Sequence, residues 1–161
     1  MPVIIDGYNL LRLVEKVSET QTLTDVAMCR IVSDYLRHIG QIGEVVFDGI
    51  GPREKAVFQN LPNLEVTFSG SQTEADSVIE TRITANTAPK RLIVVSSDHR
   101  IQNAALKRKA VSLKCEVFWA EMMQTLAKVL RKRKLAEPLE KRQGITEAET
   151  EYWLKVFGFK D

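Results

Sequence analysis

The alternation of strand and helix along this chain begins at residues 2–9, which read PVIIDGYN. The apolar, β-branched run Val3–Ile5 favours a buried strand that ends at Asp6. Glycine and asparagine follow as typical turn residues, and leucine and valine then recur at helical spacing from Leu10 to Val17. The stretch therefore predicts a strand that leads directly into a helix, with an acidic side chain at the junction.

The same alternation continues along the rest of the chain. Thr24 and Thr73 are expected to be the N-caps of two later helices, because threonine accepts hydrogen bonds from the first free backbone N–H groups of a helix. Strands that alternate with helices predict an α/β domain with a mainly parallel sheet. The predicted strands are 2–6, 44–48, 64–68, 91–96 and 115–119, and the predicted helices are 10–17, 24–39, 74–85, 101–106 and 120–134.

Length and composition fit one domain. The chain has 161 residues, of which 44% are hydrophobic and 27% charged, and this composition is ordinary for a globular protein. Glu137-Pro138 marks a break in the helical pattern. We therefore expect one domain over residues 1–135 and a C-terminal helical extension over residues 136–161, with its helix between Ile145 and Phe159.

Sequence features also indicate a compartment. No apolar run approaches the roughly 20 residues that span a bilayer, and the first residues do not resemble a secretory signal. Cys29 and Cys115 are isolated in the sequence and form no metal-binding pair, which suits a reducing environment. We expect a cytoplasmic protein that does not associate with a membrane.

Charge is distributed unevenly along the chain. The net charge is +2, but residues 1–99 carry four more acidic than basic side chains, whereas residues 100–142 carry eight more basic than acidic ones. A basic segment beside an acidic one suggests a polyanionic partner such as a nucleic acid. The alternative is a solvated helix face, which charge runs commonly form.

Acidic side chains follow the predicted strands. Asp6, Asp48 and Asp98 each come directly after an apolar run, and Asp76 lies in the first turn of a predicted helix. The carboxyl ends of parallel strands meet at one edge of the sheet, where ligands bind. Like charges gathered at one edge repel each other unless a cation is bound. Carboxylate ligands without paired His or Cys favour Mg²⁺ or Mn²⁺ over zinc.

Neighbouring polar residues extend this predicted site. Asn9 is placed to hold a metal-bound water or to orient a carboxylate, although helix-capping is its alternative role. Glu74 and Glu80 flank Asp76, and either is a candidate for an additional ligand or a solvated surface acid. Ser96 is placed to hydrogen-bond a carboxylate or a phosphate, but serine is also routine at the exit of a strand.

Four motifs together resemble a known family. They are IIDGYNLL at 4–11, VVFDG at 45–49, TEADSVIE at 73–80 and VVSSD at 94–98. Their order and spacing are similar to those of the NYN domain, a branch of the PIN-like nuclease superfamily, and most similar to its YacP-like group. The resemblance covers about residues 2–135. It implies a PIN-like, three-layer α/β/α sandwich that acts as a metal-dependent endoribonuclease.

The resemblance also implies roles for individual residues. Asp6, Asp76 and Asp98 would be the metal-binding acids, with Asn9 and Asp48 completing the site and Mg²⁺ or Mn²⁺ as the cofactor. RNA, including ribosome-associated RNA, would be the partner. The basic residues after Asp98 are then expected to contact RNA phosphates without reading sequence; they are Arg100, Lys107, Arg108, Lys109, Arg131 and Arg133.

Two other functions remain alternatives. A non-catalytic RNA- or ribosome-binding module on the same fold would keep the basic surface and lack turnover. A phosphatase on a related sheet is disfavoured, because the turn after Asp6 lacks the second aspartate that haloacid-dehalogenase-type phosphatases use. The sequence also contains neither a Gly-x-Gly-x-x-Gly motif after the first strand nor a P-loop, which argues against a nucleotide cofactor.

Overall fold

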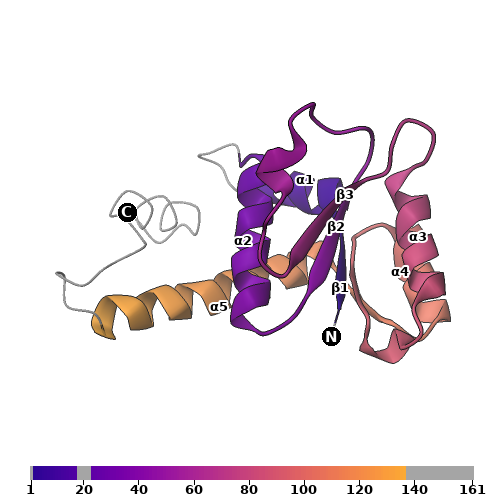
Figure 1. Ribbon diagram of the computed structural model, residues 1–161. Coiled ribbons are helices and arrows are strands. Elements are labelled where there is room, and N and C mark those ends of the chain that lie inside the picture. Colours follow the sequence, from indigo (N-terminus) through magenta and orange to yellow (C-terminus); the bar gives the residue numbers. More distant parts are fainter. Residues whose placement is uncertain (1, 18–22, 137–161) are drawn as a thin grey trace. The chain divides into compact units, whose positions relative to one another are not determined.

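The computed structural model describes residues 2–17 and 23–136. Its centre is a parallel sheet of five strands in the order β3-β2-β1-β4-β5 (Figure 1). The predicted α/β class and parallel sheet are thereby confirmed. The strands are β1 (Val3–Asp6), β2 (Gly43–Phe47), β3 (Leu64–Phe68), β4 (Ile93–Val95) and β5 (Val111–Leu113).

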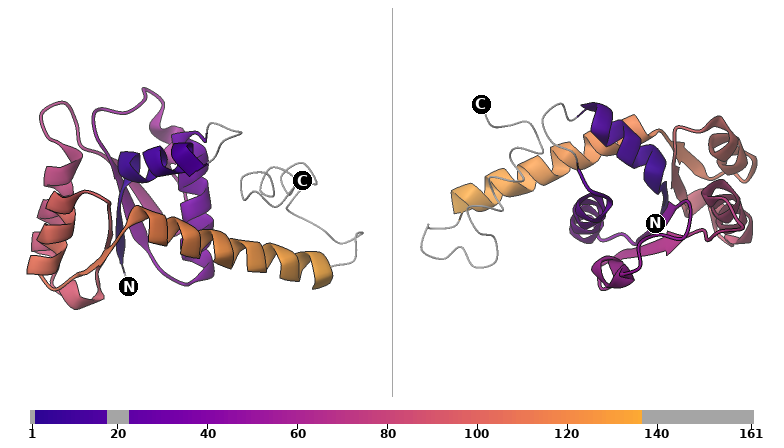
Figure 2. Two further views of the ribbon diagram at one scale, coloured as in Figure 1. Left: turned by 180° about the vertical axis from the view of Figure 1, so that it is seen from behind. Right: turned by 90° about the horizontal axis from the view of Figure 1, so that it is seen from above.

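Helices cover both faces of the sheet. One face carries α1 (Gly7–Val17) and α2 (Asp25–His38), and the opposite face carries α3 (Ala75–Ala85) and α4 (His99–Lys107) (Figures 1 and 2). Two short 3₁₀ turns, Lys55–Phe58 and Pro89–Arg91, lie in the connections. This is the three-layer α/β/α sandwich that the family resemblance implies.

The side chains of the central strands alternate between these two layers. Ile4, Val46 and Val94 are buried together with the inner faces of α3 and α4. Ile5 and Phe47, one residue further along their strands, point to the other layer, as the two-residue period of a strand requires. Burial on both faces explains why the strands read as continuous apolar runs without alternating polar residues.

Glycine permits the abrupt change from β1 to α1. Gly7 directly follows Asp6 and is the first residue of α1. A Cβ at Gly7 would lie 2.5 Å from the ring of Phe47 in β2, which is closer than carbon atoms can approach. Only glycine therefore fits at this position. It lets α1 start directly after β1, with Asp6 at the junction.

The last strand is not where the sequence analysis placed it. The prediction of a strand at 115–119 is wrong, because β5 comes earlier and Cys115 is the first residue of a long helix, α5 (Cys115–Ala136). Cys115, Phe118 and Trp119 are all buried, at a spacing that fits one helix face. A short apolar run does not distinguish a strand from a buried helix. The true strand, Val-Ser-Leu, has only three residues, and its Val111 is exposed.

The chain divides into two compact units, Met1–Trp119 and Ala120–Asp161. The structure describes residues 120–136 of the second unit as the continuation of α5. The predicted helix between Ile145 and Phe159 lies outside the described residues, and the predicted domain boundary at residue 135 stays a prediction. Among the described helices, none combines the length and the apolar character that crossing a membrane requires.

Candidate active site

Strand order makes β1 the switch point of the sheet. From β1 the chain builds the sheet outward through β2 and β3, and it then returns to the other side of β1 through β4 and β5. Ligands of open α/β sheets bind at such a switch point, outside the carboxyl ends of the strands. Asp6 is the last residue of β1, and Ser96, Ser97 and Asp98 directly follow β4. These residues therefore lie where the topology favours a binding site.

Asp6 is a buried acid. Its side chain is only 7% exposed, and its Oδ2 accepts a hydrogen bond of 3.1 Å from the hydroxyl of Ser96. Burial raises the pKa of Asp6 from 3.8 to about 6; the Ser96 hydroxyl and the backbone N–H of Asn9 lower it, whereas the charges of Asp76 and Asp98 raise it. Repulsion from two neighbouring acids shows that the three carboxyl groups share one electrostatic environment.

Ser96 connects two of these acids. Its hydroxyl donates to Asp6, and its oxygen accepts a hydrogen bond of 3.0 Å from the backbone N–H of Asp98. The side chain is 1% exposed, so water cannot easily replace either bond. The sequence analysis left two roles open for Ser96, a hydrogen bond to a carboxylate or phosphate and a routine position at a strand exit, and the structure shows the bond to a carboxylate. Only the register of β1 against β4, which pairs Ile5 with Val95, brings it next to Asp6.

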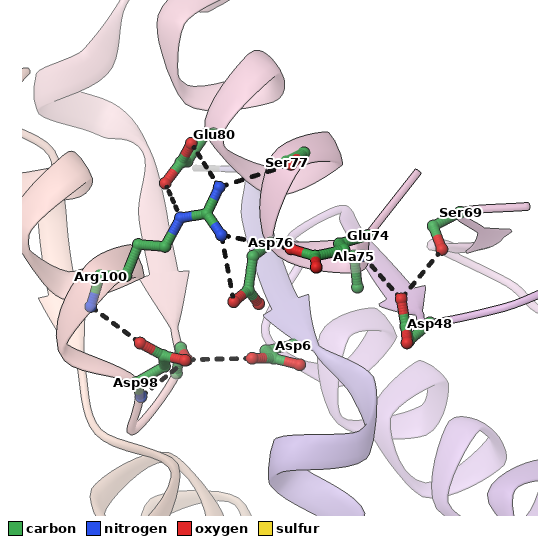
Figure 3. Close-up of polar contacts among 11 residues, drawn as sticks. Asp6, Asp48, Ser69, Glu74, Ala75, Asp76, Ser77, Glu80, Asp98 and Arg100 are labelled. Atoms are coloured by element: carbon green, nitrogen blue, oxygen red, sulfur yellow. Dashed lines mark hydrogen bonds and ion pairs between the residues drawn. The ribbon is translucent and has the colours of Figure 1, made fainter. Parts of the chain in front are cut away.

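Asp76 and Asp98 begin the two helices on one face of the sheet. Asp98 is the N-cap of α4, where its Oδ1 accepts a hydrogen bond of 2.8 Å from the backbone N–H of Arg100. Asp76 lies in the first turn of α3, and burial, followed by the charge of Asp98, raises its pKa, while Arg100 lowers it. Figure 3 shows the carboxylates of Asp6, Asp76 and Asp98 around a common region, with Arg100 beside Asp76.

The donor set fits a hard divalent cation in its chemistry. Burial, with a smaller contribution from the charges of Asp76 and Asp98, raises the pKa of Asp6, and a bound cation would stabilise the three carboxylates as oxygen ligands. Within residues 2–17 and 23–136, however, no three His, Cys, Asp or Glu side chains lie close enough to hold one ion as they stand. The guanidinium of Arg100 contacts Asp76 instead, with Nη1 3.9 Å from Oδ2.

Asn9 fixes the loop after β4. Its Oδ1 accepts hydrogen bonds from the backbone N–H of Ser97, at 3.0 Å, and from the thiol of Cys115, at 3.2 Å. Burial raises the pKa of Cys115 to about 11, so the thiol stays protonated and can donate this bond. Asn9 thus orients neighbouring backbone rather than simply capping its own helix. Its predicted contact with a metal-bound water stays a prediction.

Glu116 was not identified from the sequence. The hydroxyl of Ser97 donates a hydrogen bond of 3.1 Å to its Oε2, which brings a further carboxylate to this edge of the sheet. A residue inside a predicted strand has no reason to lie at that edge, whereas the first turn of α5 begins there. The correct position of β5 would have been the signal, since a helix that follows a parallel strand starts at its carboxyl end.

Asp48 has a partner other than the acidic cluster. Its Oδ1 accepts hydrogen bonds from the backbone N–H of Ala75, at 3.0 Å, and from the hydroxyl of Ser69, at 3.3 Å (Figure 3). The prediction that Thr73 is the N-cap of α3 is wrong: the N-cap is Glu74, which makes no side-chain capping bond. Asp48 supplies that bond from across the loop. Its predicted role as a metal ligand stays a prediction.

The two roles of Asp48 predict different results for two substitutions. Asp48→Ala removes the acceptor of the Ala75 N–H and is expected to lower the free energy of unfolding by about 1 kcal/mol, the usual cost of a lost helix cap. Asp48→Asn keeps an Oδ1 acceptor and is expected to restore most of that loss and to leave Mn²⁺ binding unchanged. Urea unfolding and calorimetric Mn²⁺ titration measure both effects. If Asp48 is instead a metal ligand, both variants would bind Mn²⁺ more weakly than the wild type.

An open pocket lies next to Asp48. Its volume is about 520 Å³, and it is lined by the loops after β2 and β3, at residues 48–51 and 70–74. The loops are held together by the Ser69 hydroxyl, which accepts a hydrogen bond from the Gly49 N–H, and by the bridge between Gly49 and Gly70. Its charged side chains, Asp48 and Glu74, are both acidic, so the pocket is unsuited to a phosphate.

The structure separates three of the six predicted RNA-binding residues from the acids. Helix α4 has nine residues and starts at the acidic edge, so its C-terminal end lies about 13 Å away. Lys107, Arg108 and Lys109 are at that far end, and Arg108 donates to the backbone oxygen of Asn86. Lys114, which follows β5, is an exposed basic residue at the acidic edge itself. Arg131 and Arg133 belong to the second unit.

Comparisons with known proteins agree with this architecture. The crystal structure of Rae1 (YacP) from Bacillus subtilis is 23% identical in sequence, with a TM-score of 0.71 over 98% of this chain and 92% of that chain. A mutant form of the same protein gives 20% identity and a TM-score of 0.65 over 97% and 91% of the two chains. At these identities the similarity establishes the fold. No curated protein matches significantly.

The family match is more specific than the structural similarity. The family described as the YacP-like NYN domain matches residues 3–156, which include every one of the four motifs quoted above. The chain therefore belongs to the YacP-like NYN domain family.

Proposed function

We propose that this protein is a divalent-metal-dependent endoribonuclease. Asp6, Asp76 and Asp98 are the residues that would hold Mg²⁺ or Mn²⁺, and the bound ion would activate water and stabilise charge on a phosphoryl oxygen. The observation that carries the proposal is the placement of three acids from distant parts of the sequence around the switch point of the sheet, where burial and then the charges of Asp76 and Asp98 raise the pKa of Asp6.

The chain's own residues would orient this site. Ser96 fixes Asp6 and the backbone of Asp98, and Asn9 fixes Ser97, so the two strand ends are tied together before any ligand binds. Groups that are held in place by such supporting hydrogen bonds need little reorganisation during a reaction. This arrangement favours catalysis over simple binding.

RNA is the proposed substrate, in the cytoplasm, with ribosome-associated RNA as the class that the family resemblance suggests. Lys114 and His99 are exposed at the acidic edge and are placed to contact phosphates near the acids. Lys107, Arg108 and Lys109 would contact a more distant part of a longer RNA. Such contacts would supply affinity that falls with salt and carries no sequence information.

Metal removal tests the proposal. Single-stranded and structured RNAs incubated with the protein are expected to be cut internally in the presence of Mn²⁺ or Mg²⁺, and cleavage is expected to stop in EDTA and return when Mn²⁺ is added in excess. Asp76→Asn is expected to lower the rate by at least about tenfold, since it removes one ligand charge. Glu65→Gln is the matched control, because Glu65 is exposed near the opposite end of the sheet.

The non-catalytic module keeps one observation in its favour. In the described part of the chain no three acidic side chains lie at ligating distance, and Arg100 already neutralises part of the cluster. The same assay separates the two functions. RNA that binds equally well with Mn²⁺ and with EDTA, and that remains intact with every RNA tested, would support the binding module and contradict the nuclease.

A further inference from the structure

Arg100 makes contacts that its predicted role does not explain. It is the second residue of α4, and its guanidinium points to the first two turns of α3 (Figure 3). Its Nε and Nη2 donate to the two carboxylate oxygens of Glu80, at 2.7 and 3.3 Å, and its Nη1 lies 3.3 Å from Oε2 of Glu74. A residue expected to bind RNA phosphate thus has its charge directed to carboxylates of its own chain.

The same residue contacts two of the three proposed metal ligands. Its guanidinium lies 3.9 Å from Asp76, and its backbone N–H donates to Asp98 at 2.8 Å. In the described part of the chain, the ion pairs of Glu74, Asp76 and Glu80 all go to Arg100. Arg100 therefore supplies the positive charge that a group of crowded acids requires.

The distances show which contact is easiest to break. The contact with Glu80 is paired and short, whereas the contact with Asp76 is the longest of the set. The Arg100 side chain is also 48% exposed, so it can move without disrupting the core. The guanidinium can consequently leave Asp76 while Glu80, one turn further along α3, still holds it.

We propose that Arg100 is a built-in counter-cation of the acidic site, which neutralises Asp76 in the metal-free protein and moves off it when a divalent cation binds. The proposal rests on the proposed metal site. It accounts for two observations together: the guanidinium of Arg100 lies against Asp76, and the acids are not arranged to hold one ion. Arg100 would therefore compete with the metal for Asp76 and would lower the affinity of the site.

The competing explanation is that Arg100 forms a purely structural ion pair between α4 and α3. Such an ion pair stabilises the protein equally with and without metal, whereas a counter-cation is needed only when the metal is absent. Arg82 offers a matched control. It extends from α3 itself, forms a partly exposed ion pair with Glu44 at 3.1 Å, and lies near the end of α3 opposite to the acids that Arg100 contacts.

The test measures Mn²⁺ binding and thermal unfolding without RNA. In Arg100→Gln, the unfolding midpoint is expected to fall in EDTA and to recover in saturating Mn²⁺, and the dissociation constant for Mn²⁺ is expected to decrease by about three- to tenfold, because one nearby positive charge is lost. Arg100→Lys keeps the charge and is expected to stay near the wild type. Arg82→Gln is expected to lower the midpoint equally in both conditions without changing Mn²⁺ binding.

Each other result decides between the ideas. An equal loss of stability in Arg100→Gln with and without Mn²⁺, weaker Mn²⁺ binding, or failure to fold even in saturating Mn²⁺ would overturn the counter-cation. If the wild type binds Mn²⁺ through Asp6 but Arg100→Gln binds it equally well, only this inference fails. If the wild type and Asp6→Asn show the same lack of Mn²⁺ binding, the proposed metal site fails as well.

Discussion

Asp6→Asn is expected to lower metal-dependent RNA cleavage by about a thousandfold and, at the same time, to make the metal-free protein more stable at pH 7. The loss of activity follows from the position of Asp6, the most buried of the three acids, whose carboxyl group is close enough to Asp76 and Asp98 to feel the charges of both. Removal of one preorganised charge from such a site has effects of this size. A gain in stability is unusual for a substitution at a buried position.

The stability gain follows from the raised pKa of Asp6. In the unfolded chain its carboxyl ionises near pH 3.8, but in the folded protein it ionises near pH 6, so the folded state binds more protons between these values. Stability therefore falls as pH rises through this window and stays low above it. The difference between these two pKa values corresponds to a loss of at most about 3 kcal/mol in the free energy of unfolding. Asparagine would remove this loss because its side chain carries no charge.

Urea unfolding in EDTA between pH 4 and 8 checks this prediction. The difference between Asp6→Asn and the wild type is expected to be small near pH 4, to grow up to about pH 6 and then to level off. Glu65→Gln, an exposed acid-to-amide change, is expected to alter neither stability nor cleavage. If Asp6→Asn cleaves RNA at the wild-type rate, Asp6 is not a metal ligand.

Much of the candidate site was predictable from the sequence, because parallel topology constrains it. An acid at the end of one parallel strand must lie at the same edge as an acid at the end of another, so the strand pattern alone is enough to group Asp6 with Asp98. Asp76 follows from the same rule, since a helix that returns from this edge begins there. The family motifs added the order of these residues.

The carboxyl edge of the sheet is several strands wide, however, and strand topology does not determine which neighbouring group each side chain contacts. Asp48 directly follows β2 at the predicted edge, but its oxygen accepts the free N–H of Ala75 at the start of α3. An unpaired N–H at a helix N-terminus competes for any nearby carboxylate. The sequence offered Thr73 for that bond, and nothing in the sequence alone shows that a residue 27 positions before Ala75 makes it instead.

The direction of α4 explains another difference. Residues 100 and 107–109 are close in sequence and were grouped as one basic surface, but a helix carries its two ends apart. Arg100 remains at the acidic edge, whereas Lys107 lies near the opposite edge. The sequence therefore identifies which residues are basic, but the end of α4 that each residue occupies determines how far it lies from the acids.

Ser96→Ala is expected to lower cleavage by about ten- to a hundredfold, the usual effect of losing a residue that orients a metal ligand. Its hydroxyl lowers the pKa of Asp6, so its removal is expected to raise that pKa above its wild-type value of about 6. The cation binds ionised Asp6 and competes with a proton for it, so at subsaturating Mn²⁺ cleavage should rise with pH as Asp6 loses its proton. The acidic limb of the pH–rate profile is therefore expected to move to higher pH, with part of the activity regained at pH 8 to 9.

Ser33→Ala is the matched control for this prediction. Ser33 is also 1% exposed, and its hydroxyl donates to the backbone oxygen of Pro62, away from the acids. Both substitutions leave a buried partner without its hydrogen bond, so both are expected to lower stability by about 1 to 3 kcal/mol. Only Ser96→Ala is expected to shift the pH–rate profile. An equal loss of rate at every pH would mean that Ser96 supports the fold of the strand end and does not tune Asp6.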